Sequence, residues 1–429
     1  MSTGLTGTRH EGDPRMTLRS AVYWAGAVVI VLLAVAPLVE YWLTNQPDQR
    51  LVDLDVYRTG GQSVLMGRPV YDTLTPPPQL LPFTYPPLGA VLAMPLAMIP
   101  WPAAQWVWTG ILYVALAITV AYGFRPLFAR IRTATRHRWA VPLAAGVLVA
   151  ALAYVMPMRD QVRFGQVGII LVAMCAADCL KPDGGRLPRG VLVGLAMAVK
   201  LTPGVFVIYL WLTGRRRAAY TAVGTAVGVT LATFLLLPGD WVDYWFGALF
   251  SSDRLGANAG TTNQGLRGML IRTYLPDLLV SVLWLVCVAA VVYVGYRGAR
   301  RLSLSGRETA GVAVTGLLSV AVSPVSWIHH LTWVVLAIGA FTGAAWNRRR
   351  LVAACITYVF FVVPVPWLGV TMLADGIGPR FLGKIVQDGF GLGALALMAL
   401  LVYWLPRHAD TPTPGNQAGA VRMTTGIHT

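Results

Sequence analysis

Long apolar runs, nearly free of charge, constrain this chain more than any other feature of its sequence. The first covers about residues 20–43, and similar runs recur as far as residue 405. A helix needs about 20 apolar residues to cross a hydrocarbon core of roughly 30 Å. Only 12% of the 429 residues are charged, against about 25% in an average soluble domain. The sequence therefore predicts a polytopic membrane protein and excludes soluble, disordered and fibrous classes.

The apolar runs divide into full spans and two interrupted segments. The segment 189–213 contains Lys200 and Pro203 at its centre, and 87–99 is bounded by prolines on both sides. Because proline removes a backbone donor and a lysine is costly in lipid, we expect both segments to enter the membrane and return. The fold class is thus all-α, with about ten full spans and about twelve helices when the re-entrant ones are counted. The predicted full spans are 20–43, 102–123, 140–157, 164–180, 218–237, 277–297, 308–323, 328–345, 351–369 and 388–405.

The net charge of +16 is interpreted as a marker of topology rather than of nucleic-acid binding, because basic residues accumulate in cytoplasmic loops. With the two re-entrant segments, the basic loops all fall on the cytoplasmic side. These are 124–139, 181–189, 214–217, 297–307 and 346–350. The external loops are then 44–86, 158–163, 238–276, 324–327 and 370–387.

This topology predicts one transmembrane domain over residues 20–405 in a bacterial plasma membrane. A cytoplasmic tail, 1–19, precedes it, and a second one, 406–429, is polar and expected to be disordered. The long external loops 44–86 and 238–276 are where we expect the functional site, because binding residues concentrate on loops held by a rigid body. The sequence does not specify an oligomeric state.

Several kinds of chemistry find no support in the sequence. No phosphate-binding loop or dinucleotide fingerprint is visible, so an activated donor would be lipid-linked or external. The four cysteines lie in apolar runs without a CxxC or Cys/His pattern, and we predict neither a disulfide nor a metal site. We also predict no cofactor and no nucleic-acid partner.

The first external loop carries the strongest catalytic candidates. Asp53 and Asp55 stand two residues apart just after a predicted span, and either would suit a general base. The alternative is an acidic start to a helix in a solvated loop. Tyr57 and Arg58 follow them and are candidates for binding substrate. Tyr85 precedes two prolines and either contacts a ligand or belongs to a rigid turn.

Positive charges that topology does not explain form a second group. Lys200, inside an apolar run, must extend its ammonium group to the membrane surface, pair with another group or meet an anionic ligand such as a lipid phosphate. Arg163 belongs to a polar group just before a span, with Arg159, Asp160 and Gln166, and a helix cap formed by Arg159 and Asp160 is the structural alternative. Asn263, Gln264 and Arg267 lie together in an external loop, where they would bind sugar hydroxyls and phosphate or else stabilise the loop.

His329 and His330 complete the candidate site. Adjacent positions on a helix point about 100° apart, so the two imidazoles cannot face one site in the same way. Zinc ligands on a helix favour spacing by four residues, which makes a metal role improbable here. We expect one of them to face a polar cavity near the outer surface.

Taken together, these motifs resemble the polyprenol-phosphate-mannose-dependent α-(1→2)-mannosyltransferases of actinobacteria, in glycosyltransferase family 87 with the GT-C membrane fold. The ordered set extends over nearly the whole chain. It comprises Asp53-Leu54-x-Val56-Tyr57, Gly67-Arg68-Pro69-x-Tyr71-Asp72, Phe83-x-Tyr85-Pro86-Pro87, Lys200-Leu201-Thr202-Pro203, Asn263-Gln264-Gly265-Leu266-Arg267-Gly268 and Ser323-Pro324-x-Ser326-Trp327-x-His329-His330.

The resemblance implies an external active site that moves mannose from polyprenyl-phosphate-mannose to a phosphatidyl-myo-inositol mannoside in lipoglycan biosynthesis. An aspartate of the first external loop, at position 53 or 55, would be the base in an inverting displacement. Lys200, Arg267 or one of the two histidines would stabilise the departing phosphate. Related enzymes branch lipomannan or transfer arabinofuranose from decaprenyl-phosphate-arabinose. A non-catalytic lipid transporter is the alternative from another class.

Overall fold

The computed structural model describes residues 14–46, 50–182, 184–251, 258–343 and 347–408. Over these residues the chain is helical, and β-structure is limited to two isolated bridges, Leu74–Pro82 and Asn263–Trp327. The predicted all-α class is confirmed. Most of the two predicted tails lies outside the described residues, although the first helix already begins at Pro14, earlier than expected.

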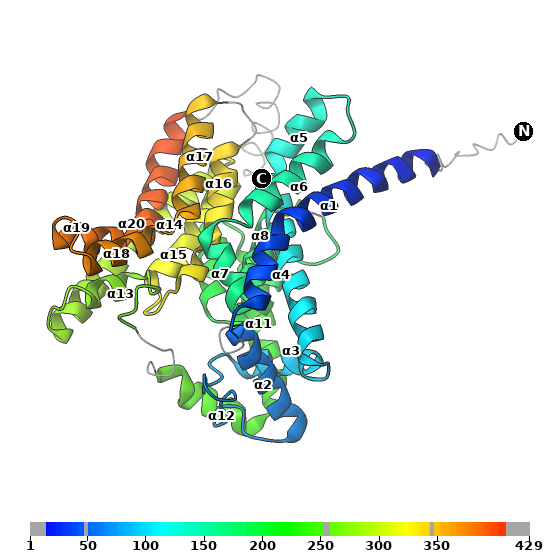
Figure 1. Ribbon diagram of the computed structural model, residues 1–429. Helices are drawn as coiled ribbons and strands as arrows, with labels where there is room; N and C mark the ends of the chain where they lie inside the picture. Colours follow the sequence, from blue (N-terminus) through cyan, green and yellow to red (C-terminus); the bar gives the residue numbers. More distant parts are fainter. Residues whose placement is uncertain (1–13, 47–49, 183, 252–257, 344–346, 409–429) are drawn as a thin grey trace, which may run out of the picture.

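The amino-terminal half builds one side of the helical body (Figure 1). Its helices are α1 (Pro14–Thr44), α2 (Val52–Met66), α3 (Pro87–Ala97), α4 (Trp101–Gly123), α5 (Arg125–Ala134), α6 (Ala140–Leu152), α7 (Met156–Phe164), α8 (Gly168–Leu180), α9 (Val191–Val199), the 3-10 turn η2 (Thr202–Gly204), α10 (Val205–Leu212) and α11 (Arg216–Leu236).

The carboxy-terminal half supplies the rest. Its helices are α12 (Pro238–Phe246), η3 (Ala248–Phe250), α13 (Leu266–Ile271), α14 (Asp277–Leu304), α15 (Glu308–Val322), the 3-10 helix η5 (Ile328–Trp333), α16 (Val334–Thr342), α17 (Arg348–Val362), α18 (Val365–Ala374), α19 (Arg380–Gln387), α20 (Gly389–Ala399), the π-helical stretch η6 (Leu400–Trp404) and η7 (Leu405–His408).

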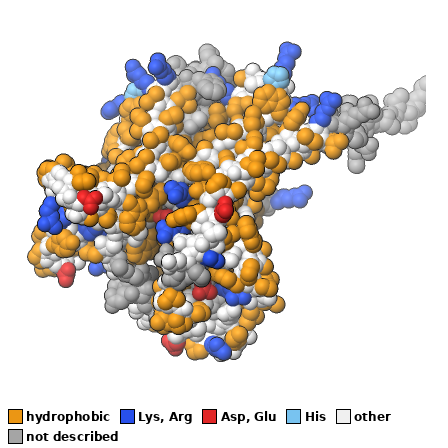
Figure 2. Space-filling view, viewed as in Figure 1, with side chains coloured by type: hydrophobic (Ala, Val, Ile, Leu, Met, Phe, Trp, Pro, Cys, Tyr) orange, Lys and Arg blue, Asp and Glu red, His pale blue; other side chains and the backbone are white. Residues whose placement is uncertain are grey.

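Fewer helices than expected are long enough to cross a membrane unaided. Among the described residues, five helices have the length and composition of a span, and two bent pairs raise this number to at most seven. Three predicted spans, at 164–180, 308–323 and 328–345, are occupied by shorter apolar helices, α8, α15 and η5 with α16. The chain is therefore a multi-pass membrane protein. Apolar side chains cover much of the body in Figure 2, as lipid-facing helices require.

The predicted cytoplasmic loops meet at one end of the body. A single cavity is lined by residues from all five, because each loop follows or precedes a helix that ends at the same level. These residues are Arg125, Lys181, Arg189, Arg215, Arg307 and Arg350.

The predicted external loops contact one another, and none of the contacting residues lines this cavity. Each of the five loops is hydrogen-bonded to at least one of the others. The hydrogen bonds are Leu51 N–H to Arg163 O at 3.0 Å, Val70 N–H to Asp240 Oδ1 at 2.7 Å, Gln264 N–H to Ser326 O at 2.7 Å, and Lys384 Nζ to Arg272 O at 3.2 Å. The structure thus separates the two sets of loops as the arginine pattern predicted. Which set faces the cytoplasm stays a prediction.

The segment around Lys200 enters the body and returns. Gly190, at the start of α9, lies against Ala218 at the start of α11, and Gly194 lies against Ala222, so the two helices run in the same direction. The chain then reverses at η2, and α10 leads back to Arg215, which lines the same cavity as Arg189. Pro203 produces this break, since it cannot donate to a continuous helix.

Topology can be measured by cysteine labelling in a variant whose four native cysteines are replaced by alanine or serine. Met66→Cys and Ala129→Cys introduce thiols at exposed positions near the two ends of the body. We expect a membrane-impermeant maleimide to label position 66 in intact cells and position 129 only after permeabilisation. Labelling of position 129 from outside would overturn the predicted orientation.

Candidate functional site

The start of α2 is anchored by buried leucines, and this anchoring directs Asp53 inward. Leu51 and Leu54 are almost fully buried, and Leu54 packs on Gly165, whose positive φ of 72° ends α7. A side chain at position 165 would collide with Leu54, and only glycine adopts such a φ readily. Asp53, in the first turn of α2, therefore faces the chain that leads from α7 into α8.

Tyr57 lies one helical turn after Asp53 and shares its face of α2. The hydroxyls of Tyr57 and Tyr85 are 3.0 Å apart, and they lie 3.2 and 3.1 Å from Gln166 Oε1. Since both tyrosines approach the amide oxygen, the amide nitrogen of Gln166 is the group that can donate to Asp53. The two aromatic rings meet edge to face, with centroids 5.2 Å apart. Four side chains from three distant segments thus form one hydrogen-bonded group.

Lys200 brings a positive charge to the same group. Its Nζ lies 5.0 Å from the centre of the Tyr85 ring and 3.1 Å from His330 Nε2. An ammonium group has donors only, so His330 offers an acceptor nitrogen to it. Lys200 and Asp53 attract each other, yet no direct ion pair joins these two described residues. A substrate group can therefore come between the two charges.

The electrostatics of Asp53 suit proton transfer near neutral pH. Burial raises the pKa of the Asp53 carboxyl to about 6, and the Gln166 hydrogen bond and the Lys200 charge oppose this rise. A carboxylate with such a pKa is ionised at pH 7 and remains basic enough to accept a proton during a reaction. We call Asp53, Tyr57, Tyr85, Gln166, Lys200 and His330 the polar cluster.

Asp55 lies elsewhere. Two helical residues turn through about 200°, and Asp55 accordingly lines a separate cavity of about 540 Å³ together with Arg58 and Pro77. Arg58 donates to the carbonyls of Leu96 and Ile99, at 3.2 and 2.9 Å, and so ties α2 to the end of α3. The geometry favours Asp53 over Asp55 and gives Arg58 a structural contact.

His329 lies beside the polar cluster, whereas the Arg163 guanidinium stacks on the ring of Phe164 at 5.1 Å. The His329 ring meets that of His330 edge to face at 4.6 Å, and its Nε2 is buried without a partner, as is Arg163 Nε. Gln161, on α7, holds this region in place by donating to the His329 carbonyl at 2.7 Å. Both predicted residues thus offer a buried nitrogen that a bound substrate could satisfy.

Asn263 and Gln264 are fully engaged by the protein backbone. Asn263 Oδ1 accepts from the N–H groups of Ser326 and Gly265, at 3.0 and 3.2 Å. Gln264 donates to the carbonyls of Thr261 and Gln387 and accepts from the N–H of Gly391. These contacts favour the structural alternative for both amides, because they join the loop 258–265 to its neighbours.

Arg267 does not share this role. It stacks on the Trp284 ring at 5.8 Å, and its buried Nε has no partner. The described contacts do not link it to the polar cluster.

Gln166 belongs in the sequence to a polar group before a span, with Arg159, Asp160 and Arg163, but it was not chosen as a site residue. In the sequence it is one polar residue at the start of an apolar run, and a helix cap explains it equally well. Only the fold shows that it contacts groups 81 and 109 residues away. Within the described residues no group of three or more His, Cys, Asp or Glu side chains is arranged to hold a metal.

An apolar cavity of about 320 Å³ adjoins the polar cluster, since Tyr57 and Tyr85 are among the residues that line it. Its other walls come from α3, α4, α8, α9 and α11, and are almost wholly hydrophobic. They include Leu88, Leu92, Trp108, Ile170, Met174, Leu195, Val199 and Val229. The site thus combines a charged centre with an apolar extension, as a ligand with a lipid chain would require.

The sequence model that describes glycosyltransferase family 87 matches residues 83–324, which is more than half of the chain. The chain belongs to this family. It is therefore a glycosyltransferase, and the alternative of a non-catalytic transporter is set aside. The matched range contains Tyr85, Gln166 and Lys200.

Curated relatives agree with this family. A "polyprenol-phosphate-mannose-dependent alpha-(1-2)-phosphatidylinositol mannoside mannosyltransferase" of Mycobacterium tuberculosis is 34% identical, over 75% of this chain and 77% of the relative. Its counterpart in Mycolicibacterium smegmatis is also 34% identical, over 76% and 77%. A phosphatidylinositol pentamannoside mannosyltransferase of M. tuberculosis is 31% identical, over 82% and 81%. No solved structure matches the chain.

The structural role of Asn263 leads to a stability prediction. Asn263→Ala leaves two buried N–H groups without an acceptor, at a cost of about 1–3 kcal/mol each. We expect a thermal midpoint several degrees lower for the Asn263→Ala variant than for the wild type. Unchanged melting of the alanine variant, together with a large rise in the donor KM, would instead indicate substrate binding.

Proposed function

We propose that this protein transfers mannose from polyprenyl-phosphate-mannose to a phosphatidyl-myo-inositol mannoside and forms an α-(1→2) bond on the external face of the membrane. The observation that carries this proposal is the placement of Asp53 and Lys200 in one polar cluster, two of whose members, Tyr57 and Tyr85, also line an apolar cavity. The names of the mycobacterial relatives supply the sugar and the lipid carrier.

Asp53 is the proposed general base. Its carboxylate takes the proton from the 2-hydroxyl of the acceptor mannose, and this oxygen attacks the anomeric carbon of the donor. The bond from that carbon to the phosphate oxygen breaks, and the bonding electrons leave with the phosphate. One displacement turns a β-linked donor into an α-linked product, so no covalent enzyme intermediate is needed.

Lys200 stabilises the leaving group in this proposal. The departing polyprenyl phosphate gains negative charge, and an ammonium group half-buried among apolar helices attracts it more strongly than it would in water. His330 holds the ammonium through Nε2, and the Tyr85 ring faces it. The polyprenyl chain occupies the apolar cavity in this proposal, since its walls match hydrocarbon and Tyr57 and Tyr85 belong both to its lining and to the polar cluster.

The assignment of the base is tested with a matched pair of variants. Asp53→Asn keeps the shape of the side chain but removes its basicity, and we expect mannosyl transfer to fall by about 10²–10⁴-fold. Asp55→Asn removes the same charge two residues away and should retain transfer within a few-fold. Full activity of a folded Asp53→Asn protein would refute the base assignment.

The substrates are tested with the same purified enzyme. Labelled polyprenyl-phosphate-mannose and decaprenyl-phosphate-arabinose are each supplied with a phosphatidylinositol mannoside or with lipomannan. Mannose on the mannoside, sensitive to an α-(1→2)-mannosidase, is the expected product. Transfer of arabinose alone, or of mannose to lipomannan alone, would exclude the proposed reaction.

The raised pKa of Asp53 predicts the pH dependence. The base works only when it is ionised, so kcat/KM should be maximal above pH 6 and fall as the pH drops through about 6. Gln166→Met removes a hydrogen bond that lowers this pKa, and the acidic limb should therefore move to higher pH. An acidic limb at the same pH in the wild type and the Gln166→Met variant would contradict this mechanism.

A further inference from the structure

A large basic cavity occupies the opposite end of the body from the polar cluster. It measures about 640 Å³. The helices α4, α8 and α15 each reach this cavity with one end and the region of the polar cluster with the other. In α4, for example, Tyr122 lines the basic cavity, whereas Trp108, fourteen residues earlier, lines the apolar cavity beside the polar cluster. Fourteen residues of helix span about 21 Å. The cavity is therefore a separate site that the proposed reaction does not use.

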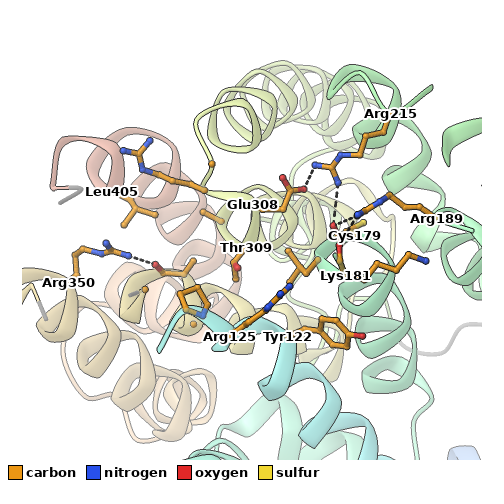
Figure 3. A pocket seen from close by; sticks show the side chains of 18 residues that line it. Tyr122, Arg125, Cys179, Lys181, Arg189, Arg215, Glu308, Thr309, Arg350 and Leu405 are labelled. Atoms are coloured by element: carbon orange, nitrogen blue, oxygen red, sulfur yellow. Dashed lines mark hydrogen bonds and ion pairs between the residues drawn. The ribbon is translucent and has the colours of Figure 1, made fainter. Parts of the chain in front are cut away.

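Positive charge predominates in its lining. Six basic side chains from five loops converge on the cavity, and Glu308 is the acidic residue among the residues that line it; Asp178 lies just behind, 2.7 Å from Lys181. Figure 3 shows these side chains arranged around a common space, with Arg350 on one side and Arg215, Arg189 and Lys181 on the other. Cytoplasmic loops are commonly basic. That rule alone does not explain why these side chains line one cavity, because like charges repel one another.

Neutral groups hold several of these charges in place. Arg189 donates to the carbonyls of Asp178, Cys179 and Lys181 at the end of α8. Arg350 donates in the same way to Ala340 and Phe341 at the end of α16. These carbonyls fix both guanidinium groups at the edge of the cavity. Arg215, by contrast, is paired with Glu308.

Two further features favour an anion. The first turn of α15 lines the cavity through Glu308, Thr309 and Ala310, and no side chain caps this helix. The N–H groups of a first helical turn lack intrahelical partners and carry partial positive charge. Arg125 is exposed at the start of α5, and Arg307 is half-buried, with one nitrogen bound to the Ser305 hydroxyl at 2.8 Å. Both can turn toward a bound ligand.

We propose that this cavity binds a phosphate group at the predicted cytoplasmic face, through Arg125, Arg307 and the first turn of α15. Arginine forks match phosphate oxygens bidentately, and basic pockets between spanning helices on this side recognise lipid head groups. The same chemistry would hold the phosphate of an anionic phospholipid or a free phosphate ion.

Binding is measured on the full-length protein in neutral detergent. One arm adds inorganic phosphate, with chloride at equal ionic strength as reference, and the other adds a short-chain phosphatidic acid, with the phosphatidylcholine of equal chain length as reference. The readouts are the shift in thermal midpoint and the apparent dissociation constant. A response in either arm supports the site and identifies the source of the phosphate.

The variants separate a built site from a diffuse positive surface. Arg125→Gln/Arg307→Gln should weaken binding by about tenfold or more, whereas Arg132→Gln removes an exposed charge from α5 outside the cavity and should leave binding unchanged. Mannosyl transfer by all these proteins reports their folding. Absence of binding in both arms, or equal weakening by Arg132→Gln, would overturn the proposal.

Discussion

The cost of placing a charged lysine among apolar helices is the constraint on which the candidate site depends. An ammonium group in such surroundings requires compensation, and Lys200 obtains it from His330, from the face of the Tyr85 ring and from the charge of Asp53. These partners come from η5, from the turn before α3 and from α2. The requirement of one side chain therefore fixes the relative positions of three elements that are far apart in sequence.

The break at Pro203 makes this arrangement possible. A continuous helix through residues 189–213 would direct Lys200 into lipid or into a neighbouring helix. The reversal at η2 instead places Lys200 at the turn of the re-entrant segment, where it lies close to Ser326 of the predicted external loop 324–327. It also returns Arg215 to the end of the body where Arg189 lies. The break at Pro203 thus places Lys200 in the polar cluster and Arg215 at the opposite end of the helical body.

Parts of the site could be predicted because charge in an apolar run is informative by itself. Lys200, the histidine pair and the Asp53–Asp55 motif stood out for this reason. The choice between Asp53 and Asp55 could not be made, because it depends on which face of α2 packs on Gly165. For Asn263 and Gln264, ligand binding and loop stabilisation both stayed open, since the sequence does not show that Ser326, Gln387 and Gly391 approach them. Among the described residues, fewer helices than the ten predicted spans are long enough to cross a membrane unaided, because composition does not show where a bend divides an apolar run.

The sequence by itself determined the class of the molecule, the separation of its loops into two sets and the family to which it belongs. These follow from local quantities: the length of apolar runs, the position of arginines and short ordered motifs. Only the tertiary structure decided which charges meet. Side chains such as Gln166 and Tyr85 interact across 81 residues, and the packing of helices, rather than their spacing along the chain, brings such groups within hydrogen-bonding distance.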